Sequence, residues 1–210
     1  MMENMEKRSL NLEIRSVDVE SRKIVGYASV FSEDYVELCD RWGEKFYERV
    51  SPGAFTNTLR DKQDDIFMLI NHNWNKVVGR RGANLTIEED SHGLRFELES
   101  PNTTDGNDLL ENVRLGLIPG CSFGFNITKQ RTKWDESYTN FYRDIQEVEL
   151  FEISATPIPV YGDTEINARS QLSIRDLRPE APSEHETEEQ QFNERNANLL
   201  SVFFNAFNQK

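Results

Sequence analysis

Apolar and polar residues alternate along short stretches of the first 160 residues, which is the pattern of half-buried β-strands. Leu10, Leu12 and Ile14 are separated by polar residues. Residues 23–31 (KIVGYASVF) are rich in β-branched and aromatic side chains, which also favour a strand. Further strands are predicted over residues 44–50, 84–89, 93–100, 121–129 and 141–155, with residues 84–89 and 93–100 joined as a hairpin by a polar turn.

A continuous apolar run, residues 65–71 (DIFMLIN), ends directly before His72. A run of this length predicts a strand buried on both faces, so His72 should lie at a rigid strand end. A first helix is predicted to open at the Ser-Pro pair of residues 51–52 and to run to about Arg60. A second helix, with leucines and a valine at helical spacing, is predicted to be capped by Asp105.

Many short strands with few helices favour a mainly β (α+β) fold over an alternating α/β sheet. We expect a closed antiparallel β-barrel with a few short helices. After about Arg169 the composition changes to Pro, Glu, Gln, Ser and Asn, which bury too little apolar surface to fold alone. The predicted organisation is therefore a domain over residues 1–169, an acidic disordered linker over residues 170–195, and an apolar segment over residues 196–210 that could form a helix.

The net charge and the cysteine content limit which partners and which cellular compartment we expect for the chain. The 210-residue chain carries 37 acidic and 24 basic residues, for a net charge of −13, so its field repels phosphate backbones and nucleic acid is not an expected partner. Cys39 and Cys121 are too few for a disulfide framework or a cysteine zinc site, and they fit a reducing cytoplasm. The chain shows no apolar stretch of signal-peptide length at its start and no membrane-spanning run, so we expect no membrane association.

Serine hydrolysis requires an imidazole close to the serine hydroxyl and a third group that orients the imidazole. The chain has three histidines, of which His185 lies in the acidic tail and His92 in a predicted hairpin turn. Ser122 lies in residues 120–125 (GCSFGF), where glycines permit the close approach of another backbone. The Gly-x-Ser-x-Gly elbow of the hydrolases is not present there. From the residues alone a structural role for His72 is favoured over a catalytic one, and nothing separates Ser122 from other serines.

A set of short segments changes this balance because of the order in which they occur. The segments are residues 51–55 (SPGAF), 71–73 (NHN) with 78–80 (VGR), 90–94 (DSHGL), 122–125 (SFGF), and 150–156 (LFEISAT) with 157–161 (PIPVY). Taken together they resemble, over about residues 10–169, the landmarks of the prohead protease family of tailed phages. This family is similar to the herpesvirus assemblins, serine proteases with a β-barrel core.

The resemblance implies a serine endopeptidase with Ser122 as nucleophile and His72 as base, needing no cofactor and no metal. Asn73 stands where the family usually has Asp, so no carboxylate acts at that position. The resemblance favours Glu152 as the third member of the triad, and His92 is the assemblin-like alternative. The implied substrates are the major capsid protein precursor, the scaffold and the chain itself, inside the phage prohead in the host cell cytoplasm.

Other interpretations stay open at this point. The chain could be a non-catalytic capsid assembly or scaffolding protein, or a cysteine hydrolase in which Cys121 acts beside His72. Adjacent strand residues point to opposite faces, so only one of Cys121 and Ser122 can face the histidine. A metal hydrolase is least supported, because the sequence has no His-x-His or His-Glu-x-x-His cluster. Whether the chain forms a homo-oligomer is also open, and Arg80 and Arg143 are unassigned candidates for stabilising an oxyanion.

Overall fold

The computed structural model describes residues 5–8, 14–40, 42–62, 65–157 and 173–178. Most of the described residues are in strands, and the helices are few and short. The mainly β (α+β) class is therefore confirmed.

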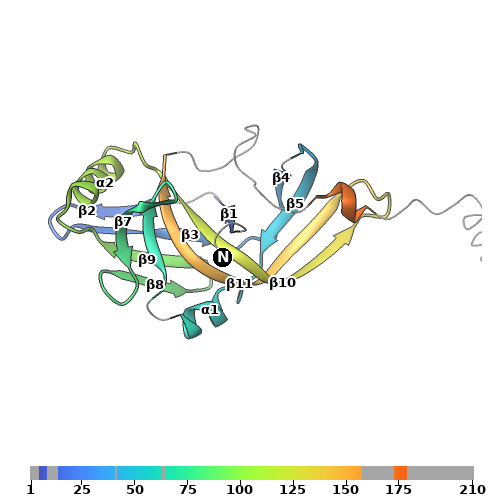
Figure 1. Ribbon diagram of the computed structural model, residues 1–210, viewed down its shortest axis with the longest axis horizontal. Coiled ribbons are helices and arrows are strands. Elements are labelled where there is room, and N and C mark those ends of the chain that lie inside the picture. Colours follow the sequence, from blue (N-terminus) through green and yellow to red (C-terminus); the bar gives the residue numbers. More distant parts are fainter. Residues whose placement is uncertain (1–4, 9–13, 41, 63–64, 158–172, 179–210) are drawn as a thin grey trace, which may run out of the picture. The chain divides into compact units, whose positions relative to one another are not determined.

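The larger sheet is built on a long antiparallel hairpin of β10 (Gly120–Trp134) and β11 (Phe141–Thr156) (Figure 1). β11 also pairs in parallel with two other strands. Its first residues pair with β5 (Lys45–Val50), and its last residues pair with β6 (Phe67–Ile70). Three further strands extend the sheet: β4 (Val36–Cys39) beside β5, β7 (Asn73–Arg80) beside β6, and β1 (Glu6–Arg8) beside β10.

The smaller sheet is antiparallel throughout, in the order β2 (Ile14–Asp18), β3 (Lys23–Val30), β9 (Gly93–Glu99) and β8 (Leu85–Glu89). The β8–β9 hairpin confirms the prediction made from the polar turn between them. Apolar side chains of both sheets pack into one core, which explains why alternation was visible in their sequences. Its fully buried members include Ile24, Phe96, Phe123 and Phe125.

The predicted closed antiparallel barrel is wrong. The outer strands β1 and β4 of the larger described sheet do not pair with each other, nor do β2 and β8 of the smaller one. β11 is the physical reason, because it is long enough to change partners: it pairs with β5 as far as Ile145 and with β6 from Glu152. The sheet therefore branches along β11 instead of closing, and these pairings are parallel rather than antiparallel.

Both helices begin elsewhere than predicted. α1 (Thr56–Asp61) starts after Phe55, because Gly53 has a φ of +90° and a helix cannot run through that conformation. α2 (Thr104–Arg114) is capped by Thr103, whose side chain accepts a hydrogen bond from the backbone N–H of Gly106. The predicted cap, Asp105, lies inside the first turn, where its negative charge faces the positive end of the helix.

The predicted linker and C-terminal segment lie outside the described residues, apart from residues 173–178. In this short stretch Arg175–Leu177 form a 3-10 helix, and Ile174 is buried against Phe46 and Phe141. The indole N–H of Trp134 donates to the carbonyl of Leu177. Packing onto the domain therefore continues to Leu177, and the predicted boundaries stay predictions. In the part of the chain that is described, no helix has the length and apolar character to cross a membrane.

The capping contact gives a test of the helix start. Replacing Thr103 by Ala should lower the free energy of unfolding by about 1 kcal/mol, because the N–H of Gly106 loses its acceptor. The matched control is Asp105→Asn, which removes only a dipole interaction and an exposed pair with Lys76, worth about a few tenths of a kcal/mol. Urea titration of both variants measures the difference. If Asp105→Asn lowered the free energy of unfolding more than Thr103→Ala, Asp105 and not Thr103 would be the cap of the helix.

Candidate active site

His72 lies in the tight turn between β6 and β7. Ile70 pairs with Asn73, and the two residues between them, Asn71 and His72, have φ values of +53° and +56°. This left-handed conformation is uncommon for histidine and is held by contacts with β11. The N–H of Asn71 donates to the carbonyl of Ala155 (3.1 Å), and the N–H of His72 donates to the Ser154 hydroxyl (3.0 Å). The predicted position of His72 after a strand is confirmed, but β7, whose outer residues are polar, was not predicted.

The imidazole of His72 contacts a buried carboxylate. Its Nδ1 lies 2.6 Å from Oε1 of Glu152, whose side chain is fully buried. The Ser154 hydroxyl donates to the other carboxylate oxygen at 2.6 Å. A carboxylate at Nδ1 favours the tautomer that carries its proton there, so Nε2 becomes the nitrogen that can accept a proton.

Gly124 makes room for this carboxylate. It lies directly opposite Glu152 in the β10–β11 register, and a Cβ at this position would collide with Oε1 of Glu152. Only glycine leaves the space that the carboxylate occupies. The glycine is visible in the sequence, but its purpose depends on a cross-strand register that the sequence does not show. The same holds for Ser154, which sequence reasoning did not select.

Ser122 lies on the same face of the hairpin. It is paired directly with Ser154, and Gly124 with Glu152, so all these positions share one face of the two strands. The Ser122 hydroxyl is buried and donates to the carbonyl oxygen of Arg8 in β1 at 2.7 Å. The structure therefore gathers Ser122, Ser154 and Glu152 on one face, with His72 bonded to the last two.

The other sequence candidates lie elsewhere. Cys121 points into the main core, where burial, and then the charge of Glu152, raise the pKa of its thiol. The ring of His92 packs edge-on against Tyr27, with 4.6 Å between centroids, in the β8–β9 turn. Arg80 is paired with Asp65, and Arg143 is buried against Glu48. His185 is outside the described residues.

Among the described residues, no group of three or more His, Cys, Asp or Glu side chains is arranged to hold a metal ion.

Comparison with known proteins agrees with the resemblance in the sequence. A family model described as Caudovirus prohead serine protease matches residues 10–176. The chain is similar to the prohead protease of Escherichia phage T5, with 25% identity over 171 residues, which cover 80% of this chain and 74% of that protein. It is also similar to the prohead protease of Enterobacteria phage HK97, with 30% identity over 164 residues, covering 72% of this chain and 64% of that protein. No solved structure matches. Since the family model spans most of the chain, including His72, Ser122 and Glu152, the chain belongs to the prohead serine protease family of tailed phages.

Proposed function

We propose that this serine peptidase cleaves the major capsid protein precursor and the scaffold inside a phage prohead, with Ser122 as nucleophile, His72 as base and Glu152 orienting the base. The observation that carries the assignment is the contact between Nδ1 of His72 and the buried Glu152 carboxylate, on the face that also carries Ser122. A carboxylate, an imidazole and a serine on one face are the parts of a serine protease triad.

The chemistry follows from these atoms. Oγ of Ser122 attacks the carbonyl carbon of the scissile bond while its proton passes to Nε2 of His72. When the tetrahedral intermediate collapses, the C–N bond breaks and the leaving amine takes this proton from Nε2. The acyl part of the substrate is then bound to Oγ of Ser122 as an ester. A water molecule attacks this ester in the same two steps, which returns Ser122 to its hydroxyl form and releases the carboxylic acid product. Glu152 keeps the Nδ1 proton in place and stabilises the imidazolium that forms twice in each cycle.

The competing functions are less well supported. A cysteine hydrolase needs a thiolate, and the Cys121 thiol is buried on the core face with a raised pKa. A non-catalytic scaffolding protein has no need for a histidine held at positive φ against a fully buried carboxylate, since both features cost stability.

The triad is tested by single and combined substitutions. Ser122→Ala should lower the cleavage rate by about a thousandfold or more, His72→Ala should do the same, and the double variant should lose no more than either. Glu152→Gln should lose less. The measurement is the mass of capsid precursor and scaffold proteins co-expressed with each variant. Undiminished cleavage by Ser122→Ala would exclude the serine mechanism.

A control and an alternative belong to this experiment. Ser29→Ala is a suitable control, because the Ser29 hydroxyl is buried in the smaller sheet without a hydrogen-bond partner among the described residues. It should cleave as the unchanged protein does. If Glu152→Gln is fully active while His92→Ala is inactive, the third member of the triad is His92.

Ser154 positions His72 and Glu152 through its hydroxyl. An experiment can distinguish this role from a contribution to packing alone. Ser154→Ala removes the hydroxyl that joins the His72 backbone to Glu152, so kcat should fall about tenfold or more while KM changes little. Ser154→Thr retains the hydroxyl and should recover part of the rate. A change confined to KM, or to the melting temperature, would show that Ser154 only supports the fold.

The tail is proposed to address the protease to the assembling head, either to the scaffold region of the capsid precursor or to another copy of the chain. Because Ile174 packs onto the domain, a truncated version must retain this residue. A version ending at Arg178 should cleave a short peptide as the full chain does but should no longer enter proheads, because an apolar segment beyond a charged linker is lost. Co-purification of each version with proheads measures incorporation. Entry of the shortened version would refute the addressing role.

A further inference from the structure

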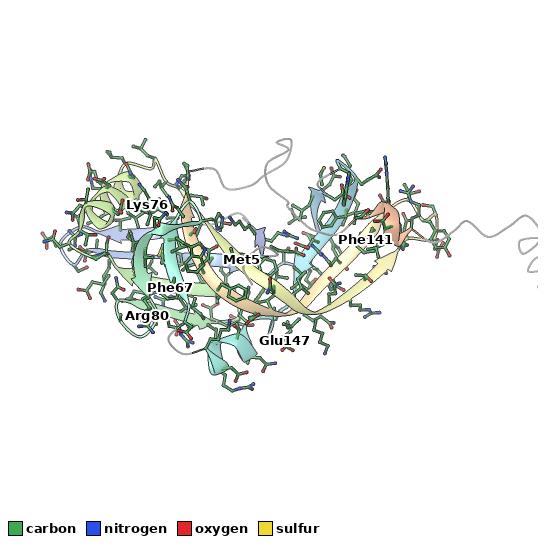
Figure 2. The ribbon with its side chains drawn as sticks, in the orientation of Figure 1. Met5, Phe67, Lys76, Arg80, Phe141 and Glu147 are labelled. Atoms are coloured by element: carbon green, nitrogen blue, oxygen red, sulfur yellow. The ribbon has the colours of Figure 1, made fainter. Side chains whose placement is uncertain are left out.

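A strand from the start of the chain covers the edge of β10 beside Ser122. β1 pairs antiparallel with β10, with Glu6 opposite Phe125, Lys7 opposite Gly124 and Arg8 opposite Phe123. In the described part of the sheet, β1 is the outermost strand on this side. Figure 2 shows Met5, which precedes β1, at the middle of the β10–β11 hairpin, where it lies against Gly124. β1 thus lies where an extended peptide would add to the sheet next to the nucleophile.

The contact with Ser122 is made by the main chain of β1. The Ser122 hydroxyl donates its proton to the carbonyl oxygen of Arg8, 2.7 Å away, and the serine side chain is 1% exposed. A hydroxyl whose proton is given to a carbonyl oxygen is not giving it to an imidazole, so any peptide in this place, β1 included, reacts only when the hydroxyl turns toward His72. β1 therefore brings a peptide carbonyl to the nucleophile and at the same time keeps other peptides away from it.

The side chain of Arg8 is buried against an acidic partner. Its Nε and one terminal nitrogen donate to the two carboxylate oxygens of Glu48, in the two-pronged arrangement that suits a guanidinium. Burial alone would lower the pKa of Arg8, but Glu48 and Glu6 raise it above its ordinary value. Burial would likewise raise the pKa of Glu48, but the charges of Arg8 and Arg143 hold it below its ordinary value. Both groups are therefore charged. The position of Arg8, whose carbonyl group meets Ser122, thus favours a cationic side chain.

Two residues earlier in β1, the charges are reversed. Glu6 points to the same side as Arg8, and its carboxylate accepts from a terminal nitrogen of Arg143 at 3.1 Å. Arg143 and Glu48 are register partners on β11 and β5, so the fixed pair presents one positive and one negative group to β1. Lys7, between Glu6 and Arg8, alternates to the other side of the strand. An acidic residue, any residue and a basic residue form the pattern that this pair would recognise.

β1 can leave without stranding a buried charge. Arg143 Nε donates to Glu48 Oε2 at 2.6 Å, so the two remaining groups still form a neutral pair. The departing Glu6 and Arg8 also carry opposite charges and contact each other. Buried ion pairs add little net stability, because desolvation offsets most of the attraction. A strand of three residues, held by such pairs and by a short ladder to β10, is suited to exchange with another peptide.

We propose that the edge of β10 and the Glu48–Arg143 pair form the substrate site, which takes an extended peptide with an acidic residue two positions before a basic one, and that β1 occupies this site as a built-in competitor. A peptide that replaces β1 brings the carbonyl group of its basic residue to Ser122, so the bond after that residue is cleaved. The proposal rests on the assignment of Ser122 as nucleophile.

Synthetic peptides test the recognition directly. The first peptide has the sequence of residues 4–12 (NMEKRSLNL), and three others carry Gln in place of the glutamate, the lysine or the arginine. With the full chain, we expect cleavage after the arginine, with kcat/KM reduced about a hundredfold by the arginine change and about tenfold by the glutamate change. The lysine change is the matched control and should alter kcat/KM less than about twofold. Equal cleavage of all four peptides would overturn the proposal.

Variants of the full chain test the competition. Glu6→Gln combined with Arg8→Gln weakens β1 while leaving the Glu48–Arg143 pair intact and the net charge unchanged. It should raise kcat/KM for the first peptide about tenfold, and Lys7→Gln should not. If β1 is only a structural edge strand, the double variant will melt at a lower temperature without cleaving faster, which contradicts the proposal.

A binding measurement covers the case in which cleavage is too slow to follow. In the Ser122→Ala background, the double variant should bind the first peptide about tenfold more tightly than the peptide without arginine, as measured by fluorescence anisotropy. Absence of this preference would overturn the recognition even if the triad is correct. Conversely, cleavage that follows the acidic-x-basic pattern but persists in Ser122→Ala would reject the nucleophile and leave the peptide site standing.

Discussion

The buried carboxylate of Glu152 is the constraint on which the arrangement of the candidate active site depends. A fully buried carboxylate is costly unless its oxygens are bonded, and here one oxygen faces His72 Nδ1 and the other accepts from Ser154. Both partners are in turn fixed by β11, Ser154 as part of the strand and His72 through its bonded turn. The cost of burial is offset only when all of these groups take up one geometry. That geometry is the one a base needs before it can activate a serine.

β11 pairs in parallel with two different strands, and each pairing places a group of buried polar residues. Near its end it pairs in parallel with β6, and the parallel direction places the turn that follows β6 over Ser154 and Glu152. Near its start it pairs in parallel with β5, which sets Glu48 beside Arg143. If β6 were antiparallel to β11, the start of β6, and not the turn that follows it, would lie near Ser154 and Glu152. The branched sheet that replaces the expected barrel is therefore what carries His72 to its carboxylate.

The sequence predicted the elements with strong local patterns and missed those without them. The hairpin over residues 84–100 was predicted from the polar turn between its strands, and the strand over residues 23–31 from its β-branched and aromatic side chains. β7 was missed because half of its positions are exposed polar residues and only two are buried, and β1 because Glu-Lys-Arg carries no strand signal at all. The barrel was predicted wrongly because parallel pairing between distant strands leaves no mark on either strand.

The candidate site divides in the same way. Ser122, His72 and Glu152 came from the resemblance to a family, since the pattern alone favoured a structural role for the histidine. Ser154 and Gly124 could be recognised only once the register of β10 and β11 was known. Their residue types are common in strands, and what distinguishes them is the residue across the strand pair. Glu48 and Arg143 are a similar case, because charged residues in strands are usually exposed, and these two are buried.

A competitor on the same chain changes how the enzyme responds to its surroundings. A segment tethered by a short linker acts at an effective concentration of roughly millimolar, whatever the concentration of the protein. A free peptide at micromolar concentration then displaces β1 rarely, while a substrate packed around the protease at a comparable local concentration displaces it often. The enzyme would remain slow when dilute and become active where its substrates are crowded. Glu6 and Arg8 contact the Glu48–Arg143 pair that a matching substrate would use in the proposed site. Recognition of substrate and inhibition by β1 would then have one structural origin, and a change that weakens one would weaken the other.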